Sequence, residues 1–273
     1  MEIGIIGTGN MGRILTEALL DGKAISPSSM VITNRTISKA IAIQENYPSI
    51  QITNEISEVG KKADLIFICV KPHDVHDVAV TLKPFLTKGK CVVSITSPIN
   101  VEQLESVIPC SVARAIPSIT NRALSGISLL TFGHHCDEKW KTSLINLLNH
   151  ISTPLEIDDN ITRVASDIVS CGPAFFSYIT QRFIQAAVNK TDIDVNNATI
   201  LASEMLIGLG ELLRKGYFTL PTLQEKVCVK GGITGEGIEV LEKELGNIFE
   251  HLFQATHLKF EDDLTDIKKQ YTI

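Results

Sequence analysis

Several features are missing from this sequence, and each absence excludes a class of protein. No apolar run approaches the roughly 20 residues that a membrane-spanning helix needs. The N-terminus has no charged segment followed by an apolar one, as a secretory leader would have. The chain lacks a long basic run and carries a net charge of −6, which argues against a nucleic-acid-binding surface and a polybasic membrane patch. We therefore expect a cytoplasmic protein without a nucleic-acid or membrane partner.

The six cysteines form no C-x-x-C pair. They are scattered, mostly within apolar segments, as is typical of reduced thiols that fill core space. His73 and His76 are close in sequence, but no acidic or cysteine cluster accompanies them, so a surface or helix-start position is favoured over a metal pair. We expect no disulfide, no structural zinc and no other metal site.

The most informative stretch that is present lies at the N-terminus. Residues 3–6 form a short β-branched run, and three glycines follow at the G-x-G-x-x-G spacing before an amphipathic helix expected at residues 14–20. This order is typical of a dinucleotide-binding turn, in which the free amides of the helix hold the pyrophosphate. A glycine-rich turn without a cofactor is the alternative, and the context favours the cofactor site. The predicted binding residues here are Gly7, Gly9, Asn10, Met11 and Gly12.

The end of the second expected strand, residues 30–33, indicates which cofactor is bound. An NAD enzyme usually places an acidic residue about 20 residues beyond the glycines, whereas an arginine there accommodates a 2′-phosphate. This chain has Asn34, Arg35 and Thr36 at that point and no carboxylate. We therefore expect all three residues to contact NADP(H), and NADP(H) rather than NAD(H) to be the cofactor. The alternative, that Arg35 only solvates the start of the next helix, is less consistent with the spacing.

Strands and helices continue to alternate through the first half of the chain. Ligands of open α/β sheets bind outside the carboxyl ends of the strands. Val70, Lys71, Pro72 and Thr96 follow such strands and are predicted to contact the cofactor. The further expected strands are residues 51–53, 64–70, 91–95, 111–116 and 128–132, and a helix is expected at residues 139–149.

Strand patterns end near residue 158, and helical patterns follow at residues 161–189, 196–215 and 237–271. Gly172 and Pro173 interrupt the first of these and predict a kink, which either bends the helix around a neighbouring core or shapes a pocket. The fold class is therefore α/β, with a Rossmann-type doubly wound sheet at residues 1–155 and an all-α domain at residues 156–273. Three elongated helices seldom bury their apolar faces alone, so we expect a homodimer through the C-terminal helices.

A second glycine-rich stretch precedes the last helical pattern. Gly231, Gly232, Gly235 and Gly237 crowd a helix start, as in an anion-binding turn whose amides could hold a carboxylate. Thr234 lies within this turn as either the helix cap or a hydrogen-bond donor to a ligand. The residues alone favour the cap.

The order of these motifs resembles the Δ1-pyrroline-5-carboxylate reductase family, whose members reduce a cyclic imine to L-proline with NAD(P)H. The similarity covers nearly the whole chain and is greatest to reductase-like members associated with late competence operons. It implies that Thr234 hydrogen-bonds the ring nitrogen of the imine acid and that the amides of residues 232–234 hold its carboxylate. The motifs that carry it are residues 7–12, 70–72, 171–175 and 231–234. The substrate-binding residues that it implies are Lys230, Gly231, Gly232, Ile233 and Thr234.

The chain departs from the family pattern where cofactor and substrate are expected to meet. Val229 and Lys230 replace a serine and a proline, Ser118 replaces the asparagine of P-N-T-P, and Pro98 ends a segment that is A-A-G in the family. The leading hypothesis is an NADPH-dependent reductase of pyrroline-5-carboxylate or a related imine. The alternative is an NADP-binding regulatory protein with little or no proline-forming activity. A hydroxy-acid dehydrogenase is disfavoured because residues 161–189 contain no lysine to act as its base.

Overall fold

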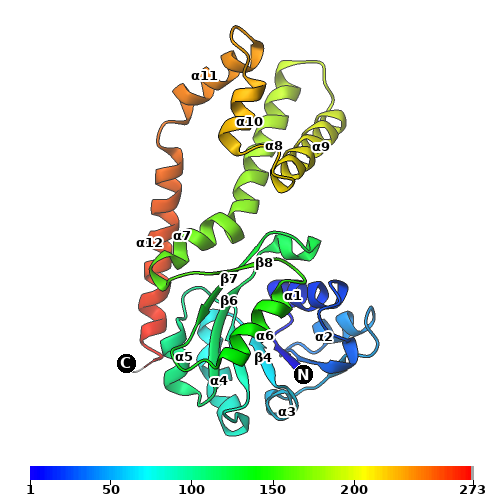
Figure 1. Cartoon of the computed structure of the whole chain (residues 1–273), viewed down its shortest axis with the longest axis vertical. Helices are drawn as coiled ribbons and strands as arrows, with labels where there is room; N and C mark the ends of the chain where they lie inside the picture. Colours follow the sequence, from blue (N-terminus) through cyan, green and yellow to red (C-terminus); the bar gives the residue numbers. More distant parts are fainter. Residues whose placement is uncertain (272–273) are drawn as a thin grey trace. The chain divides into compact units, whose positions relative to one another are not determined.

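The computed structural model describes residues 1–271 of the chain. Its central feature is an eight-stranded sheet in the order β3-β2-β1-β4-β5-β6-β7-β8 (Figure 1). All neighbouring strands are parallel except β6 and β7, which are antiparallel. The strands are β1 (Ile3–Ile6), β2 (Met30–Thr33), β3 (Gln51–Ile52), β4 (Leu65–Ile68), β5 (Cys91–Ser94), β6 (Ser111–Ile116), β7 (Ile127–Phe132) and β8 (Thr153–Glu156).

Helices cover both faces of this sheet, as expected for a doubly wound fold. Side chains of a strand point to alternate faces, so Ile5 belongs to one apolar cluster and Ile6 to the other. The predicted fold class is confirmed. The helices of this part are α1 (Asn10–Asp21), α2 (Ser38–Gln44), α3 (Ile56–Lys62), α4 (Val75–Leu82), α5 (Val101–Val107) and α6 (Glu138–Leu148). Short helical turns occupy Pro27–Ser29, Pro72–Asp74, Lys83–Phe85, Ile119–Ala123 and Asp159–Ile161.

The sheet has one strand that the sequence patterns did not predict. Strand β8 runs parallel to β7 at the edge of the sheet. Three of its four residues are exposed, and one residue is a proline. Such a strand has neither the apolar run nor the alternation that identifies a strand in sequence.

The helices after the sheet also differ in part from the prediction. The pattern at residues 237–271 is not one helix, because Gly246 adopts a positive φ of 49° and separates two helices. A further short helix precedes them. The helices are α7 (Thr162–Ser166), α8 (Gly172–Lys190), α9 (Val195–Arg214), α10 (Leu220–Val227), α11 (Ile233–Leu245) and α12 (Ile248–Lys268). No helix within residues 1–271 has both the length and the apolar character needed to cross a membrane.

The predicted interruption at Gly172 and Pro173 takes the form of a π-helical segment, Asp167–Cys171, between α7 and α8. Proline has no N–H, so the carbonyl of Val169, four residues earlier, loses its helical partner. The Ser118 hydroxyl donates to this carbonyl oxygen at 2.6 Å. The Ser170 hydroxyl donates in return to the carbonyl oxygen of Pro117 at 3.1 Å. The irregular turn is therefore stabilised by hydrogen bonds to the end of β6.

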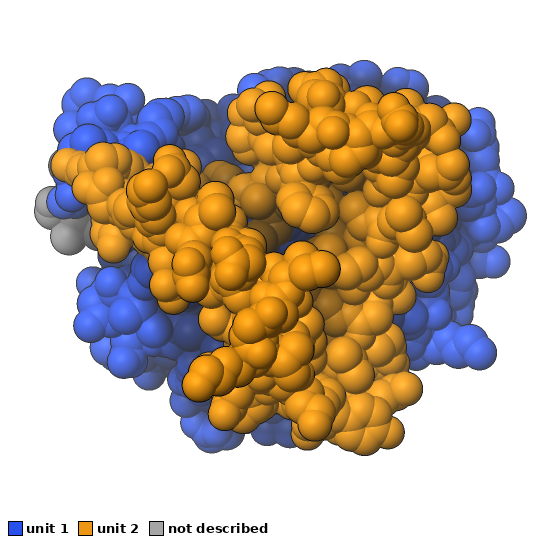
Figure 2. Space-filling view, turned by 90° about the horizontal axis from the view of Figure 1, so that it is seen from above, with its two compact units in different colours: residues 1–173, 255–273 blue, residues 174–254 orange. Residues whose placement is uncertain are grey.

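By its internal contacts the chain divides into two compact units (Figure 2). The first comprises residues 1–173 and 255–273, and the second residues 174–254. The end of α12 belongs to the first unit because Ile267 and Tyr271 are buried in the same apolar cluster as Val75 of α4. The predicted domain boundary at residue 155 rests instead on where the strand patterns end, and it stays a prediction.

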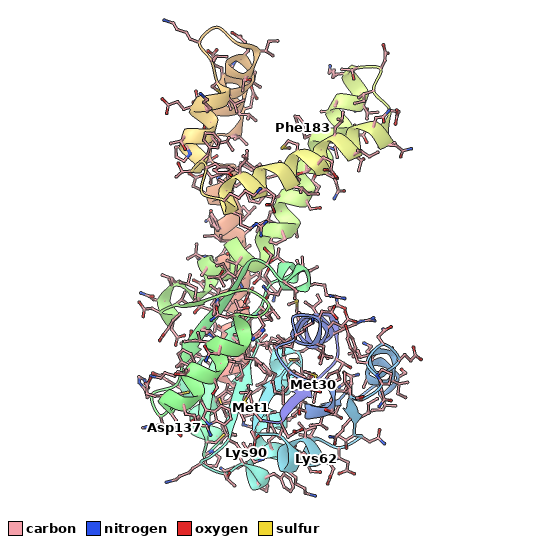
Figure 3. The ribbon with its side chains drawn as sticks, turned by 45° about the vertical axis from the view of Figure 1, so that its right-hand side comes forward. Met1, Met30, Lys62, Lys90, Asp137 and Phe183 are labelled. Carbon is pink, nitrogen blue, oxygen red and sulfur yellow. The ribbon has the colours of Figure 1, made fainter. Side chains whose placement is uncertain are left out.

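The second unit exposes much of its apolar surface. Phe183 of α8 has 66% of its surface exposed (Figure 3). Of the hydrophobic side chains in this unit, the structure buries only Ala198 and Ala202 of α9. Other large apolar side chains that are exposed here include Phe176, Tyr178, Leu201, Ile207, Tyr217 and Ile233.

Candidate functional site

A cavity of about 510 Å³ lies at the carboxyl ends of β1, β2 and β4. This is where ligands bind in sheets of this kind. Of the residues predicted to bind the cofactor, those that line it are Gly7, Gly9, Asn34, Arg35, Thr36, Val70 and Lys71. Asn10, Met11, Gly12, Pro72 and Thr96 do not line it, and their contact with a cofactor stays a prediction.

The glycine turn shows why three glycines are needed. Gly7 has a φ of 97°, and a Cβ there would lie 2.7 Å from the carbonyl oxygen of Cys69. A Cβ on Gly12 would lie 2.0 Å from the carbonyl oxygen of Gly7, so the first turn of α1 packs directly on the loop. A Cβ on Gly9, by contrast, would meet no atom within 4 Å. Packing within the chain explains Gly7 and Gly12, whereas Gly9 faces open space in which a ligand can approach the backbone.

The polar groups of this turn are available to an anion. Gly9 is the N-cap of α1 and provides no side-chain cap, so the first amides of the helix lack that partner. The Thr8 hydroxyl is buried and has no hydrogen-bond partner among the described residues. A buried polar atom without a partner is costly unless a ligand or water satisfies it. The free amides at the start of α1 fit a dinucleotide pyrophosphate, whereas Thr8 does not line the cavity.

Asn34 has a structural role in the chain, while its predicted contact with the cofactor stays a prediction. Its side-chain Oδ1 accepts a hydrogen bond from the amide of Thr8 at 2.9 Å. Its Nδ2 donates to the carbonyl oxygen of Thr36, also at 2.9 Å. Asn34 therefore connects the glycine turn to the end of β2 while it lines the cavity.

Two cations line the same end of the cavity. Arg35 follows β2, and Lys39 lies in the first turn of α2, four residues later. Both are exposed, and neither has an ion-pair partner within residues 1–271. Unpaired cations at this strand end suit the 2′-phosphate of NADP.

The sequence patterns missed several cavity residues. Asn54 is the second residue after β3, and Lys39 is one helical turn beyond Arg35, so the position of each in the sequence was a usable signal. Asp74 and Asp77 line the cavity from the beginning of α4. No motif identifies them, because the helix face that reaches the cavity depends on packing.

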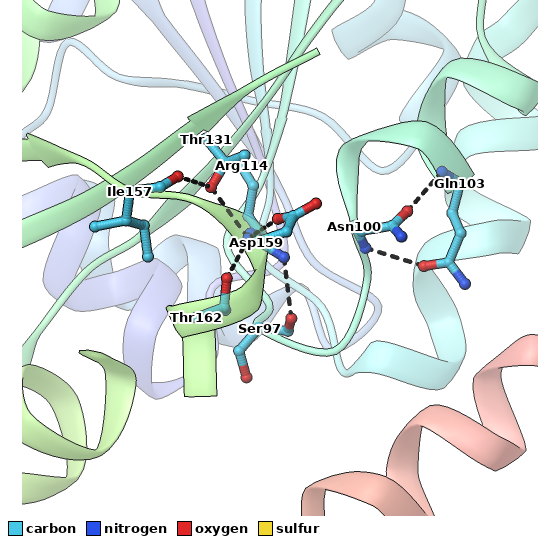
Figure 4. A network of polar contacts seen from close by, with 8 residues as sticks. All are labelled: Ser97, Asn100, Gln103, Arg114, Thr131, Ile157, Asp159 and Thr162. Carbon is cyan, nitrogen blue, oxygen red and sulfur yellow. Dashed lines mark hydrogen bonds and ion pairs between the residues drawn. The ribbon is translucent and has the colours of Figure 1, made fainter. Parts of the chain in front are cut away.

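The end of β5 is occupied by contacts within the chain. Thr96 is buried, and its hydroxyl lies 3.0 Å from that of Ser94. Beside it, the buried Arg114 of β6 forms an ion pair with Asp159 and donates to the Thr162 hydroxyl at 2.6 Å (Figure 4). Burial lowers the pKa of Arg114, and Asp159 opposes that effect. Arg114 thereby connects the sheet to the start of α7.

A second buried ion pair lies in the π-helical segment. The Asp167 side chain has no exposed surface, and its Oδ1 is 2.9 Å from Arg163 Nη2. The Thr256 hydroxyl of α12 donates to Asp167 Oδ2 at 2.8 Å. Sequence reasoning identified neither this group nor Arg114, although an arginine in the apolar strand β6 was a usable signal.

The predicted substrate residues form one turn at the start of α11, in the second unit. Gly231 has a φ of 73°, and Gly232 is the N-cap of the helix. The interpretation of Thr234 as the cap is therefore wrong, because Thr234 is the second residue of the helix. Its hydroxyl is exposed and has no hydrogen-bond partner within residues 1–271. Lys230 and Ile233 are exposed in the same turn.

Comparisons with known proteins match two separate parts of the chain. A family model described as pyrroline-5-carboxylate reductase dimerisation matches residues 159–262. A model described as NADP oxidoreductase, coenzyme F420-dependent, matches residues 2–98.

Similar proteins match over nearly the full length. ComE operon protein 4 of Bacillus subtilis is 53% identical over 100% of both chains. Pyrroline-5-carboxylate reductase 3 of the same organism is 29% identical over 98% of this chain and 99% of its own length. The crystal structure of Plasmodium falciparum pyrroline carboxylate reductase with NADP bound has a TM-score of 0.81 at 20% identity, covering 99% of this chain and 98% of that one.

Proposed function

The chain belongs to the pyrroline-5-carboxylate reductase family, and on this basis we propose that it is an NADPH-dependent reductase of Δ1-pyrroline-5-carboxylate or a closely related cyclic imine acid. The observation that most supports this proposal is the cavity in which the glycine turn meets Arg35 and Lys39. The turn suits a pyrophosphate, and the two cations suit a 2′-phosphate.

The cofactor would be held by groups that the chain leaves unsatisfied. The amides at the start of α1 would bind the pyrophosphate, and Arg35 and Lys39 would bind the 2′-phosphate. Val70 and Lys71, which line the cavity, would lie beside the nicotinamide half. When bound, NADPH supplies the hydride.

The turn at the start of α11 would bind the imine acid. The Thr234 hydroxyl donates a hydrogen bond to the ring nitrogen, which favours the charge that develops there during reduction. The hydroxyl is too weak an acid to supply the proton itself, so it orients the nitrogen while water provides the proton. The amides of Gly232, Ile233 and Thr234 bind the carboxylate, and the nearby Lys230 ammonium replaces the hydroxyl that the family's serine would offer.

The assembly that fits this function is a homodimer formed by the C-terminal helices. The second unit buries too few apolar side chains of its own, and large ones such as Phe183 and Leu201 are exposed. A second copy of the chain would cover them, as in proteins whose helices are apolar on an outward face. The match to a dimerisation model supports this arrangement.

The test is NADPH oxidation, followed optically, with purified protein and pyrroline-5-carboxylate. Thr234→Ala should lower kcat about 100-fold, as the loss of one preorganised donor does, and leave the dissociation constant of NADPH unchanged. Thr234→Ser, which keeps the hydroxyl, is the matched control and should retain most of the activity. Equal activity of wild type and Thr234→Ala would contradict the assigned role.

A second candidate is a reductase-like NADP-binding protein that regulates a competence or developmental process. Two observations favour it: the similarity to ComE operon protein 4, and the use of the Ser118 hydroxyl to hold Val169 rather than face a ligand. Val229 and Pro98 also depart from the family pattern. Tight NADPH binding without turnover of pyrroline-5-carboxylate would select this candidate over the reductase.

A further inference from the structure

One face of α4 lines the cavity with an unusual combination of side chains. Asp74, at the N-cap, and Asp77, Val78 and Thr81 all line it. Their spacing of three or four residues places them on one side of the helix. Val78 is almost fully buried and, with Ile56 of α3, offers an apolar wall. Two carboxylates beside this wall are unexpected in a cavity that otherwise suits a polyanion.

Asp74 is free to accept a hydrogen bond from a ligand. Aspartate at an N-cap usually accepts from an amide of the first turn. Asp194 does so at the start of α9, where its Oδ1 lies 2.9 Å from the amides of Asn196 and Asn197. Asp74 precedes α4 but has a helical backbone, as the last residue of the short turn Pro72–Asp74, and its side chain makes no cap hydrogen bond. Within residues 1–271 its carboxylate, which is half-buried, has no other hydrogen bond and no ion pair.

Asp77 differs in its surroundings. Its side chain is 91% exposed, and one carboxylate oxygen lies 3.6 Å from Nδ1 of His76. The hydroxyl of Thr81 donates to the backbone carbonyl oxygen of Asp77 at 2.8 Å, so it is already used within the helix. Of the polar groups on this face, the Asp74 carboxylate is therefore the one that is both sheltered and unsatisfied.

The chemistry of this face identifies the part of the nucleotide that it fits. A carboxylate repels phosphate, so the 2′-phosphate must lie toward Arg35 and Lys39 and the pyrophosphate toward the start of α1. A flat apolar ring with an N–H donor at its edge fits Val78, Ile56 and Asp74 together. The adenine base has this character, because its exocyclic amine donates beside apolar ring faces.

We propose that Asp74 determines the base specificity of the site by accepting a hydrogen bond from the exocyclic amine of adenine. This inference rests on the proposed binding of NADPH. It adds a specificity residue on α4 to the two cations proposed to bind the 2′-phosphate.

The test compares NADPH with its hypoxanthine analogue, in which a carbonyl oxygen replaces the amine. Dissociation constants are measured by titrating the full-length protein and following nucleotide fluorescence. Wild type should bind the analogue at least about tenfold more weakly, since a carbonyl oxygen would face the carboxylate without a proton between them. Asp74→Asn should bring the two constants within about twofold, because the amide can donate to the carbonyl oxygen.

Asp77→Asn is the matched control and should keep the wild-type preference, because Asp77 is on the same helix face but solvated. The preference is the ratio of the two dissociation constants, both measured on the same folded protein. A change in stability alone therefore leaves this ratio unchanged. Equal binding of both nucleotides by wild type, or an unchanged preference in Asp74→Asn, would overturn the inference and leave the proposed function standing. Failure of wild type to bind NADPH at all would instead overturn the proposed function itself.

Discussion

At the scale of single residues, we expect the choice between the two nicotinamide cofactors to depend on Arg35 and Lys39. Both line the cavity at the end of β2, and neither has an ion-pair partner within residues 1–271. An arginine binds a phosphate through two parallel N–H donors, whereas a lysine acts as a point charge. Arg35 should therefore contribute more than Lys39 to the preference for NADPH.

Replacement of Arg35 by alanine should weaken NADPH binding about tenfold or more and change NADH binding little, because only NADPH carries the 2′-phosphate. Titration of both nucleotides against the same protein checks this. Lys88→Ala, which removes an exposed cation outside the cavity, is the control. Equal losses for the two nucleotides would show that Arg35 does not read the 2′-phosphate.

Ser118 shows that a departure from a family motif can have a structural cause. Its hydroxyl is buried and donates to the Val169 carbonyl that Pro173 leaves without a helical partner. Ser118→Ala should lower the free energy of unfolding by about 1–3 kcal/mol, since it leaves a buried carbonyl unsatisfied. Urea unfolding measures this loss. Ser106→Ala removes a hydroxyl that donates to the carbonyl oxygen of Gln103 within α5, and it should cost less. Equal losses of unfolding free energy in the two variants would argue against the special role of Val169.

At the scale of secondary-structure elements, the break between α11 and α12 depends on Gly246. Its backbone has φ 49° and ψ −128°, a region that residues with a Cβ rarely adopt. A Cβ there would meet no atom within 4 Å, so backbone conformation and not space requires the glycine.

Gly246→Ala should therefore lower the free energy of unfolding by about 1–2 kcal/mol. Gly208, within α9, also has open space around it but lies in a regular helix. Gly208→Ala should raise the free energy of unfolding by up to about 1 kcal/mol, because alanine has the higher helix propensity. Thermal and urea unfolding of both variants and of wild type measure these changes, which should have opposite signs. A lower free energy of unfolding in both variants would mean that the added methyl group, and not the φ angle, is responsible.

The sequence patterns predicted elements best where periodicity and burial agree. The strands β1, β2 and β6 appear within one residue of the expected positions, because each is a short apolar run between turn residues. The break at Gly246 was hidden because Leu245 and Ile248 continue the apolar spacing across it.

Some residues of the candidate site could likewise be predicted from the sequence, and others could not. The position of Gly7, Gly9 and Arg35 at the cavity could be predicted, because the chemistry of a dinucleotide fixes the spacing of such residues along the chain. The position of Asp74 at the cavity could not be predicted, since it depends on which face of α4 is turned to the cavity.

At the scale of the whole molecule, the exposed apolar side chains of residues 174–254 predict self-association. Sedimentation or light scattering of the 29.9 kDa chain should give the mass of a dimer. Phe183→Lys places a charge on an apolar side chain that is 66% exposed and should shift the protein toward monomer at micromolar concentration. Val80→Lys, at a position 48% exposed on α4 in the first unit, should leave the mass unchanged. A monomeric wild type would contradict the proposed homodimer.

The return of α12 to the first unit has a consequence for the genetics of this protein. Residues 174–254 are covalently an insertion, because the chain enters and leaves them from the same compact unit. A premature stop codon that removes residues 255–273 would leave residues 174–254 in the chain. It would remove Ile267 and Tyr271 from the apolar cluster that includes Val75 and Val78. Val78 lines the nucleotide cavity, so a nonsense allele near the 3′ end of the gene should behave as a defect in nucleotide binding and folding, not as a loss of the last helix alone.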